Sequence, residues 1–200
     1  MIRAAVRRFC SAASSSNVHV HNEAKWPAEV LRTALSSCRV VEDFVTEAEE
    51  QKFMDEIEPH MKRLRYERAH WDDAIYLYRE REQKKWTPEN EAIVQRILGD
   101  FFSCGRAQDP VRPPPGPPRT WPHQAAHRRR SAGSRFLSAS VMRLRHKDRK
   151  DEWILDLRLP RRSLYILSDA TRFDFTHEIL SNEESFFRGL ARPRKAAEWP

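Results

Sequence analysis

The chain has few cysteines and no long apolar run. Its 200 residues include only Cys10, Cys38 and Cys104, which are widely spaced and odd in number. They provide neither a disulfide framework nor a paired metal-binding motif, so a reducing compartment suits the protein. No apolar segment reaches the length of a membrane-crossing helix, and we expect no membrane association. The length fits one domain, or one domain with appendages.

Acidic residues are missing from the N-terminal segment. Residues 1–22 carry three arginines and no Asp or Glu. In a helix, Ile2, Val6 and Phe9 would form an apolar stripe with arginines beside it. This amphipathic, acid-poor pattern is typical of a mitochondrial transit peptide. We therefore expect residues 1–30 to be a leader and the mature protein to lie in the mitochondrial matrix, although a disordered basic tail would have the same composition.

The net charge of +7 raises the question of nucleic-acid binding. Residues 105–135 hold seven arginines and one aspartate, and with the N-terminal segment they account for the excess, so the rest of the chain is slightly acidic. A nucleic-acid groove would instead place positive charge on the folded body. The basic segment is better interpreted as a solvated tail or linker.

Residues 38–102 have helical signals. A strand-like entry, RVVEDFV, is followed by Thr46 and Glu49, which form a capping box that predicts a helix start. Apolar residues at helical spacing continue over 53–64. Thr87-Pro88-Glu89 predicts the start of a second helix, because proline is tolerated in the first turn.

Residues 103–135 differ in character from both flanks. Between Arg112 and Arg135 there is no Ile, Leu, Val, Phe or Met, and seven of the thirteen prolines lie between Pro110 and Pro122. Such a segment cannot bury enough apolar surface to offset the entropy of ordering, so we expect it to be disordered or extended. The abrupt change suggests a frame-shifted or mis-spliced stretch, with residues 189–200 a second divergent tail.

Strand signals return over residues 136–188. Four runs, SASVMRLRH, EWILDLRL, SLYILSD and RFDFTHEI, are separated by short polar turns. Helices followed by strands predict an α+β architecture. If the last run is a strand from Arg172, then Phe173, Phe175 and His177 share one face. The two rings mark that face as buried, so the imidazole would need a partner inside.

Several of these stretches resemble the AlkB family of Fe(II)- and 2-oxoglutarate-dependent dioxygenases. The matching segments are VVEDFVTEAEE, YERAHWDDAI, AIVQRIL, SVMRLRH, SLYIL and DFTHEILSNEESFF, which together cover about residues 38–102 and 138–188. The resemblance implies a double-stranded β-helix, or jelly roll, with N-terminal helices and, in this chain, an incomplete set of strands. It also implies Fe(II) and 2-oxoglutarate as cofactors, and oxidation of a C–H bond with decarboxylation of the keto acid.

The resemblance assigns roles to two residues. His177 in DFTHEIL would be the distal iron ligand, and Tyr165 in SLYIL would contact 2-oxoglutarate. The alternatives are a core histidine satisfied by a backbone carbonyl and a tyrosine that serves ordinary packing.

The other ligands are not where the resemblance places them. A His-x-Asp pair would fall inside the proline-rich segment, where the chain has His123 and Ala125. No Asp or Glu occurs from Pro110 to Lys147. The letters match at His70-Trp71-Asp72 and His146-Lys147-Asp148, but a three-letter pattern is expected by chance in a chain with eight histidines.

The arginines that would grip the keto acid belong, by the same resemblance, to a strand beyond ESFF. Arg192 and Arg194 lie in the basic loop before that strand. We therefore expect the chain as written to be catalytically deficient. Two alternatives are a non-catalytic interaction protein and a nucleic-acid demethylase. The substrate could be a small molecule, a protein or RNA.

Overall fold

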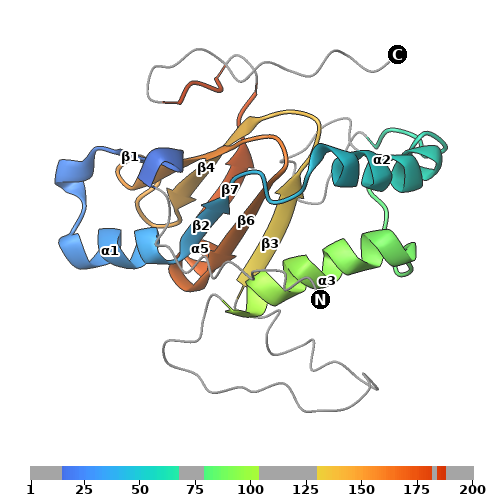
Figure 1. The fold of residues 1–200 in the computed structure, drawn as a ribbon. Helices are drawn as coiled ribbons and strands as arrows, with labels where there is room; N and C mark the ends of the chain where they lie inside the picture. The colour runs from blue at the N-terminus through green and yellow to red at the C-terminus, as the bar shows by residue number, and fades with distance from the viewer. Residues whose placement is uncertain (1–14, 68–78, 104–129, 182–183, 188–200) are drawn as a thin grey trace, which may run out of the picture.

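Two antiparallel sheets form the body of the molecule (Figure 1). The computed structural model describes residues 15–67, 79–103, 130–181 and 184–187. The four-stranded sheet has the order β1-β5-β4-β7, and the three-stranded sheet has the order β2-β6-β3. The strands are β1 Val18–His21, β2 Cys38–Val41, β3 Arg130–Arg135, β4 Ser140–His146, β5 Ile154–Leu159, β6 Ser163–Ser168 and β7 Phe175–Ile179. The expected combination of helices with antiparallel strands is confirmed.

The main core lies between the two sheets. On β5, the side chains of Leu155, Leu157 and Leu159 are completely buried, as their alternation in the sequence predicts. They belong to one apolar cluster with Leu167 of β6 and Val40 of β2, so the sheets pack face to face. We call these the inner faces. Burying each leucine contributes about 1.5–3 kcal/mol.

Helices cover the outer side of the three-stranded sheet and one end of the body. They are α1 Ala28–Ser36, α2 Glu47–Met61, α3 Pro88–Ser103 and α5 Asp169–Phe173, with short 3-10 helices η1 Ser15–Asn17 and η2 Glu23–Lys25. Ile97 of α3 packs against Leu164 and Ile166 on the outer face of β6. Within the described residues, no helix combines the length and apolarity needed to cross a membrane.

The predicted starts of α2 and α3 are confirmed. The Thr46 hydroxyl accepts a hydrogen bond from the Glu49 amide at 3.2 Å, and the Thr46 amide donates to the Glu49 carboxylate at 2.8 Å. Helix α3 begins at Pro88. Helix α2 ends at Met61, so the predicted helical stripe runs a few residues too far.

Residues 15–30, the later part of the segment predicted to be a leader, belong to the folded body. Strand β1 pairs with β5 along its whole length. Val18 is 6 % exposed and Trp26 is 7 % exposed. Cleavage near residue 30 would remove this edge strand and open the core, so a leader compatible with the fold ends before Ser15. Residues 1–14 lie outside the described part of the chain.

The last six residues of the segment 103–135, predicted to be disordered or extended, form strand β3. All six residues of Arg130–Arg135 pair with β6, and Ala132 packs against Leu164 and Ile166. Small and polar residues suffice here because the neighbouring strand supplies the hydrogen-bond partners and most of the apolar surface. Residues 104–129 lie outside the described part of the chain.

Candidate functional site

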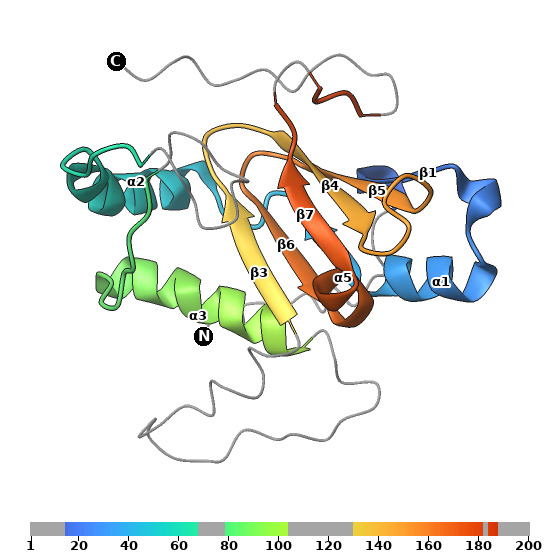
Figure 2. The ribbon, with the colours of Figure 1, turned by 180° about the vertical axis from the view of Figure 1, so that it is seen from behind.

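Strand β7 is shorter than the sequence predicts. Residues Asp169–Phe173 form the helical turn α5, closed by the Asp174 amide donating to the Ala170 carbonyl oxygen at 2.8 Å. Figure 2 shows α5 where the chain passes from β6 to β7. Phe173 therefore does not share a strand face with His177, and it is 45 % exposed. The predicted strand start at Arg172 is wrong, because Arg172 lies in α5 and β7 begins at Phe175.

His177 lies on the inner face of β7, as predicted. It is paired with Leu144 of β4, whose side chain is fully buried between the sheets, and directly opposed residues share a face. Phe175 lies on the same face and is buried. His177 is nevertheless exposed as a whole residue, since β7 is an edge strand of its sheet. The expectation of a deeply buried imidazole is wrong.

The imidazole of His177 has a backbone partner. Its Nε2 lies 2.7 Å from the carbonyl oxygen of Thr171 in α5. Because a carbonyl oxygen only accepts, Nε2 carries the proton, and Nδ1 keeps the lone pair. This hydrogen bond is the alternative arrangement considered from the sequence, and it also fixes which nitrogen could coordinate a metal.

The surroundings of His177 favour the neutral ring. Partial burial of the imidazole lowers the pKa of His177 although the residue as a whole is exposed, and the charges of Arg172 and Lys147 lower it further. The Thr171 carbonyl works in the opposite direction, but its effect on the pKa is smaller. A neutral imidazole is the form that donates one N–H and offers one lone pair.

His146 has a packing role. Its ring packs edge-on against Trp153 and Phe175, and its Nδ1 accepts a hydrogen bond from the Asp148 amide at 3.2 Å. The side chains of His146 and Asp148 thus do not form a ligand pair in the described structure. The other letter match, His70 to Asp72, lies outside the described residues, and so do His123, Arg192 and Arg194.

Tyr165 lies on the inner face of β6. It is half-buried and packs against the main core, on the sheet that faces His177. On β3 its direct partner is Gly133, and a Cβ atom added there would lie 2.6 Å from the phenol oxygen. The structure therefore brings Tyr165 and His177 to the same inter-sheet space. Burial raises the pKa of the Tyr165 hydroxyl, which Arg135 partly offsets, so the hydroxyl stays protonated at neutral pH.

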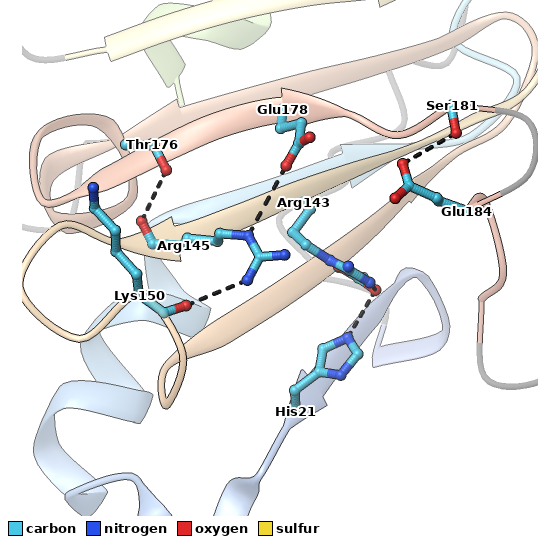
Figure 3. A network of polar contacts seen from close by, with 9 residues as sticks. His21, Arg143, Arg145, Lys150, Thr176, Glu178, Ser181 and Glu184 are labelled. Carbon is cyan, nitrogen blue, oxygen red and sulfur yellow. Dashed lines mark hydrogen bonds and ion pairs between the residues drawn. The ribbon is translucent and has the colours of Figure 1, made fainter. Parts of the chain in front are cut away.

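A second polar cluster lies on the outer face of the four-stranded sheet (Figure 3). Asp156 of β5 is 1 % exposed and accepts two hydrogen bonds from the Arg143 guanidinium, each of 2.8 Å. His21 of β1 lies 2.7 Å from the same carboxylate. Around it, Glu178 faces Arg145 at 3.9 Å. The cluster joins three neighbouring strands through one buried carboxylate.

Sequence reasoning did not identify this cluster or Arg135. His21 and Asp156 are 135 positions apart, and each has an ordinary sequence context. Arg135 was included in the segment expected to be disordered. Only the pairing of β3 with β6 shows that it belongs to a sheet.

Comparison with known proteins gives a clear relationship. The chain is 39% identical over 173 residues to the bovine protein named alpha-ketoglutarate-dependent dioxygenase alkB homolog 7, mitochondrial, covering 84% of this chain and 78% of the bovine protein. The mouse protein of the same name is 39% identical over 157 residues, covering 76% of this chain and 71% of the mouse protein. The chain belongs to the AlkB family. No protein-family model matches it.

Membership of the AlkB family confirms the resemblance noted in the sequence. The names of both relatives also confirm the mitochondrial location predicted from the N-terminal residues. The roles of His177 and Tyr165 in this AlkB-family chain stay predictions.

An iron centre does not fit the described part of this AlkB-family chain. Of His177, only Nδ1 is free to coordinate, since Nε2 is bonded to Thr171. Across residues 15–67, 79–103, 130–181 and 184–187, no three His, Cys, Asp or Glu side chains gather closely enough to hold a metal ion. A ferrous site of the two-histidine, one-carboxylate type therefore has one candidate ligand here.

Proposed function

We propose that this chain is an AlkB-family protein of the mitochondrial matrix with a jelly-roll body, and that it is catalytically deficient as written. Its relatives' names describe alpha-ketoglutarate-dependent dioxygenases. The jelly roll is supported by two antiparallel sheets packed face to face around one apolar core. The candidate metal ligand and the candidate keto-acid residue both face the space between those sheets, which is where a jelly-roll enzyme of this family would hold its cofactors.

The proposed deficiency rests on the environment of His177. Its Nε2 is engaged by a backbone carbonyl, and no second or third ligand joins it among the described residues. The sequence from Pro110 to Lys147 cannot contribute a carboxylate, because it has no Asp or Glu. One imidazole does not retain iron(II) in competition with water and cellular chelators.

Turnover of 2-oxoglutarate tests this proposal. The purified chain is incubated with iron(II), ascorbate and 2-oxoglutarate, and succinate is measured against a His177→Ala variant. The bovine relative, assayed in parallel, controls for the reaction conditions. We expect equal succinate from the chain and the variant, at the level of the protein-free reaction. Iron-dependent succinate that disappears in His177→Ala would refute the deficiency.

A non-catalytic interaction protein is the second candidate. It is favoured by a core that needs no metal, since Leu144, Leu155 and Leu164 are completely buried. Thermal unfolding distinguishes a working scaffold from a defective product. A cooperative transition in a soluble protein supports the scaffold, whereas aggregation without a transition indicates a broken chain whose sheet edges pair between molecules.

A further inference from the structure

Two histidines of β1 lie side by side on the outer face of the four-stranded sheet. His19 and His21 are two positions apart on this edge strand, so their side chains share a face. The alternate residues Val18 and Val20 belong to the core on the inner face. The two imidazole rings have their centroids 4.6 Å apart. Imidazole is the commonest metal ligand among side chains, so the pair is a candidate chelate.

The separation of the two rings fits a shared metal ion. A metal bound about 2.0–2.1 Å from a ring nitrogen lies about 3.2 Å from the centre of that ring. Two rings bound to one ion at a right angle then have centres about 4.5 Å apart, whereas a tetrahedral angle requires about 5.2 Å. The observed 4.6 Å matches the right angle, which is the ligand angle of square-planar and octahedral sites. The ring planes are inclined by 67°, so the rings are not stacked in parallel.

Asp156 orients the ring of His21. The Nε2 atom of His21 lies 2.7 Å from Oδ2 of this buried carboxylate, and Figure 3 shows the imidazole directed from β1 toward Arg143, which holds the same carboxylate. Because a carboxylate accepts, Nε2 donates, and the neutral ring keeps its lone pair on Nδ1. Histidines that bind metals characteristically donate their other N–H to a carboxylate or carbonyl, which fixes the tautomer and makes the ligand more basic. His21 already has this partner.

The ring of His19 is packed from its other side by Phe187. The two ring centroids are 6.2 Å apart in an edge-on arrangement. Phe187 is 4 % exposed and is itself fixed by contacts with Val141 and Leu180. His19 is half-buried, and the side chain of His21 is 31 % exposed. Both rings are therefore partly ordered before a ligand binds, which reduces the entropy cost of binding, and solvent still reaches the pair.

We propose that His19 and His21 bind one nickel(II) or copper(II) ion on the outer face of the four-stranded sheet, with water in the remaining positions. Imidazole nitrogen suits these ions, whereas magnesium and calcium prefer oxygen ligands. The right angle between the rings favours them over zinc, which is tetrahedral in most protein sites. Among the residues that the structure describes, no third His, Cys, Asp or Glu side chain completes a metal-binding group, so the ion is exchangeable.

The proposed site goes beyond the proposed function. It lies on the opposite face of the sheet from His177, and it shares no residue with the site expected for the family. Iron(II) binds nitrogen ligands more weakly than nickel(II) or copper(II) does. Any weak binding of iron at His19 and His21 is the same in the native chain and in His177→Ala, so the two sites are measured separately.

Isothermal titration with nickel(II) tests the site. The full chain is purified without a histidine tag and titrated in a non-coordinating buffer, with zinc(II) and magnesium(II) in parallel. The variants are His19→Gln, His21→Gln and the double variant. His60→Gln is the matched control, because His60 is also half-buried but lies in α2. Each variant is first checked for an unchanged melting temperature. The titrations contain neither iron nor 2-oxoglutarate, so their result is independent of the turnover experiment.

We expect one nickel(II) ion per chain, weaker binding of zinc(II) and no binding of magnesium(II). Loss of a hydrogen-bond partner of a metal-binding histidine weakens binding by about 10–100-fold, and loss of a ligand should cost at least as much, so each single variant should lose about tenfold or more. The double variant should lose little beyond either single variant, because one imidazole no longer chelates. His60→Gln should bind as the native chain does.

If His21→Gln does not fold because Asp156 loses a partner, His19→Gln decides, since it keeps the hydrogen bond between His21 and Asp156. The absence of saturable nickel(II) binding, or native affinity in His19→Gln, would overturn the proposal. An equal loss in His60→Gln, or tighter binding of zinc(II) than of nickel(II), would overturn it as well.

Discussion

Replacing Asp156 by Asn should destabilise the fold more than any substitution of an exposed charge. Asp156 is 1 % exposed and is held by Arg143 through two hydrogen bonds of 2.8 Å and by His21 at 2.7 Å. Removing one partner of a buried ion pair costs about 3–5 kcal/mol, because the other charge is left without a counter-ion. The Arg143 side chain is 20 % exposed and can partly rehydrate, so we expect about 3 kcal/mol.

The effect should also depend on pH. Burial alone would raise the pKa of Asp156, but hydrogen bonds from Arg143 and His21 outweigh it and hold the pKa below its ordinary value. The folded state then binds fewer protons than the unfolded state near the ordinary pKa of about 3.9. The stability that Asp156 contributes is therefore complete above this pH and is lost as the pH falls below it.

Urea unfolding followed by circular dichroism measures both effects. Glu178→Gln is the control, because Glu178 is 56 % exposed and only 3.9 Å from Arg145, and such surface pairs contribute about 0–1 kcal/mol. The difference between the native chain and Asp156→Asn should be constant near neutral pH and shrink in acid. A loss no larger than that of Glu178→Gln would refute the account of the buried cluster.

Three further predictions concern His177, Gly133 and the N-terminal segment. The lowered pKa of His177 means that the native chain loses stability as the pH falls through about 6.5, and His177→Gln should reduce that loss between about pH 7.5 and 5.5 in urea titrations. Gly133→Ala should destabilise the chain by about 1–3 kcal/mol, because its Cβ would meet the Tyr165 ring. The control Gly99→Ala in α3, where nothing lies within 4 Å of the added Cβ, should be neutral or stabilising. Equal melting temperatures of the two variants would contradict this prediction. A chain that starts at Ser15 should unfold at the same temperature as the full chain. A chain that starts at residue 27 should not unfold cooperatively, because it lacks β1 and Trp26. A normal unfolding transition in this shorter chain would show that β1 is dispensable.

The sequence predicts the elements that carry their own local signals. The alternation of Leu155, Leu157 and Leu159 predicts a half-buried strand, and the Thr46–Glu49 box predicts a helix start; both are confirmed. Family membership is also predictable, because the stretches around Tyr165 and His177 are distinctive.

Elements whose order depends on distant partners are not predictable in this way. Strand β3 has a small and polar sequence without a strand signal, and it forms by backbone pairing with β6. The exposure of His177 follows from α5 and from the position of β7 at the edge of its sheet. Likewise, the alternation in the sequence predicts an exposed position for Asp156, but it is buried, and His21 and Arg143 contact it from neighbouring strands.

Metal retention tests the central claim most directly. The native chain and His177→Ala are loaded anaerobically with iron(II), passed through a desalting column and analysed for bound iron. The account predicts that both retain the same trace amount, because His177 has no second or third ligand among the described residues. One iron per native chain, lost in His177→Ala, would contradict it.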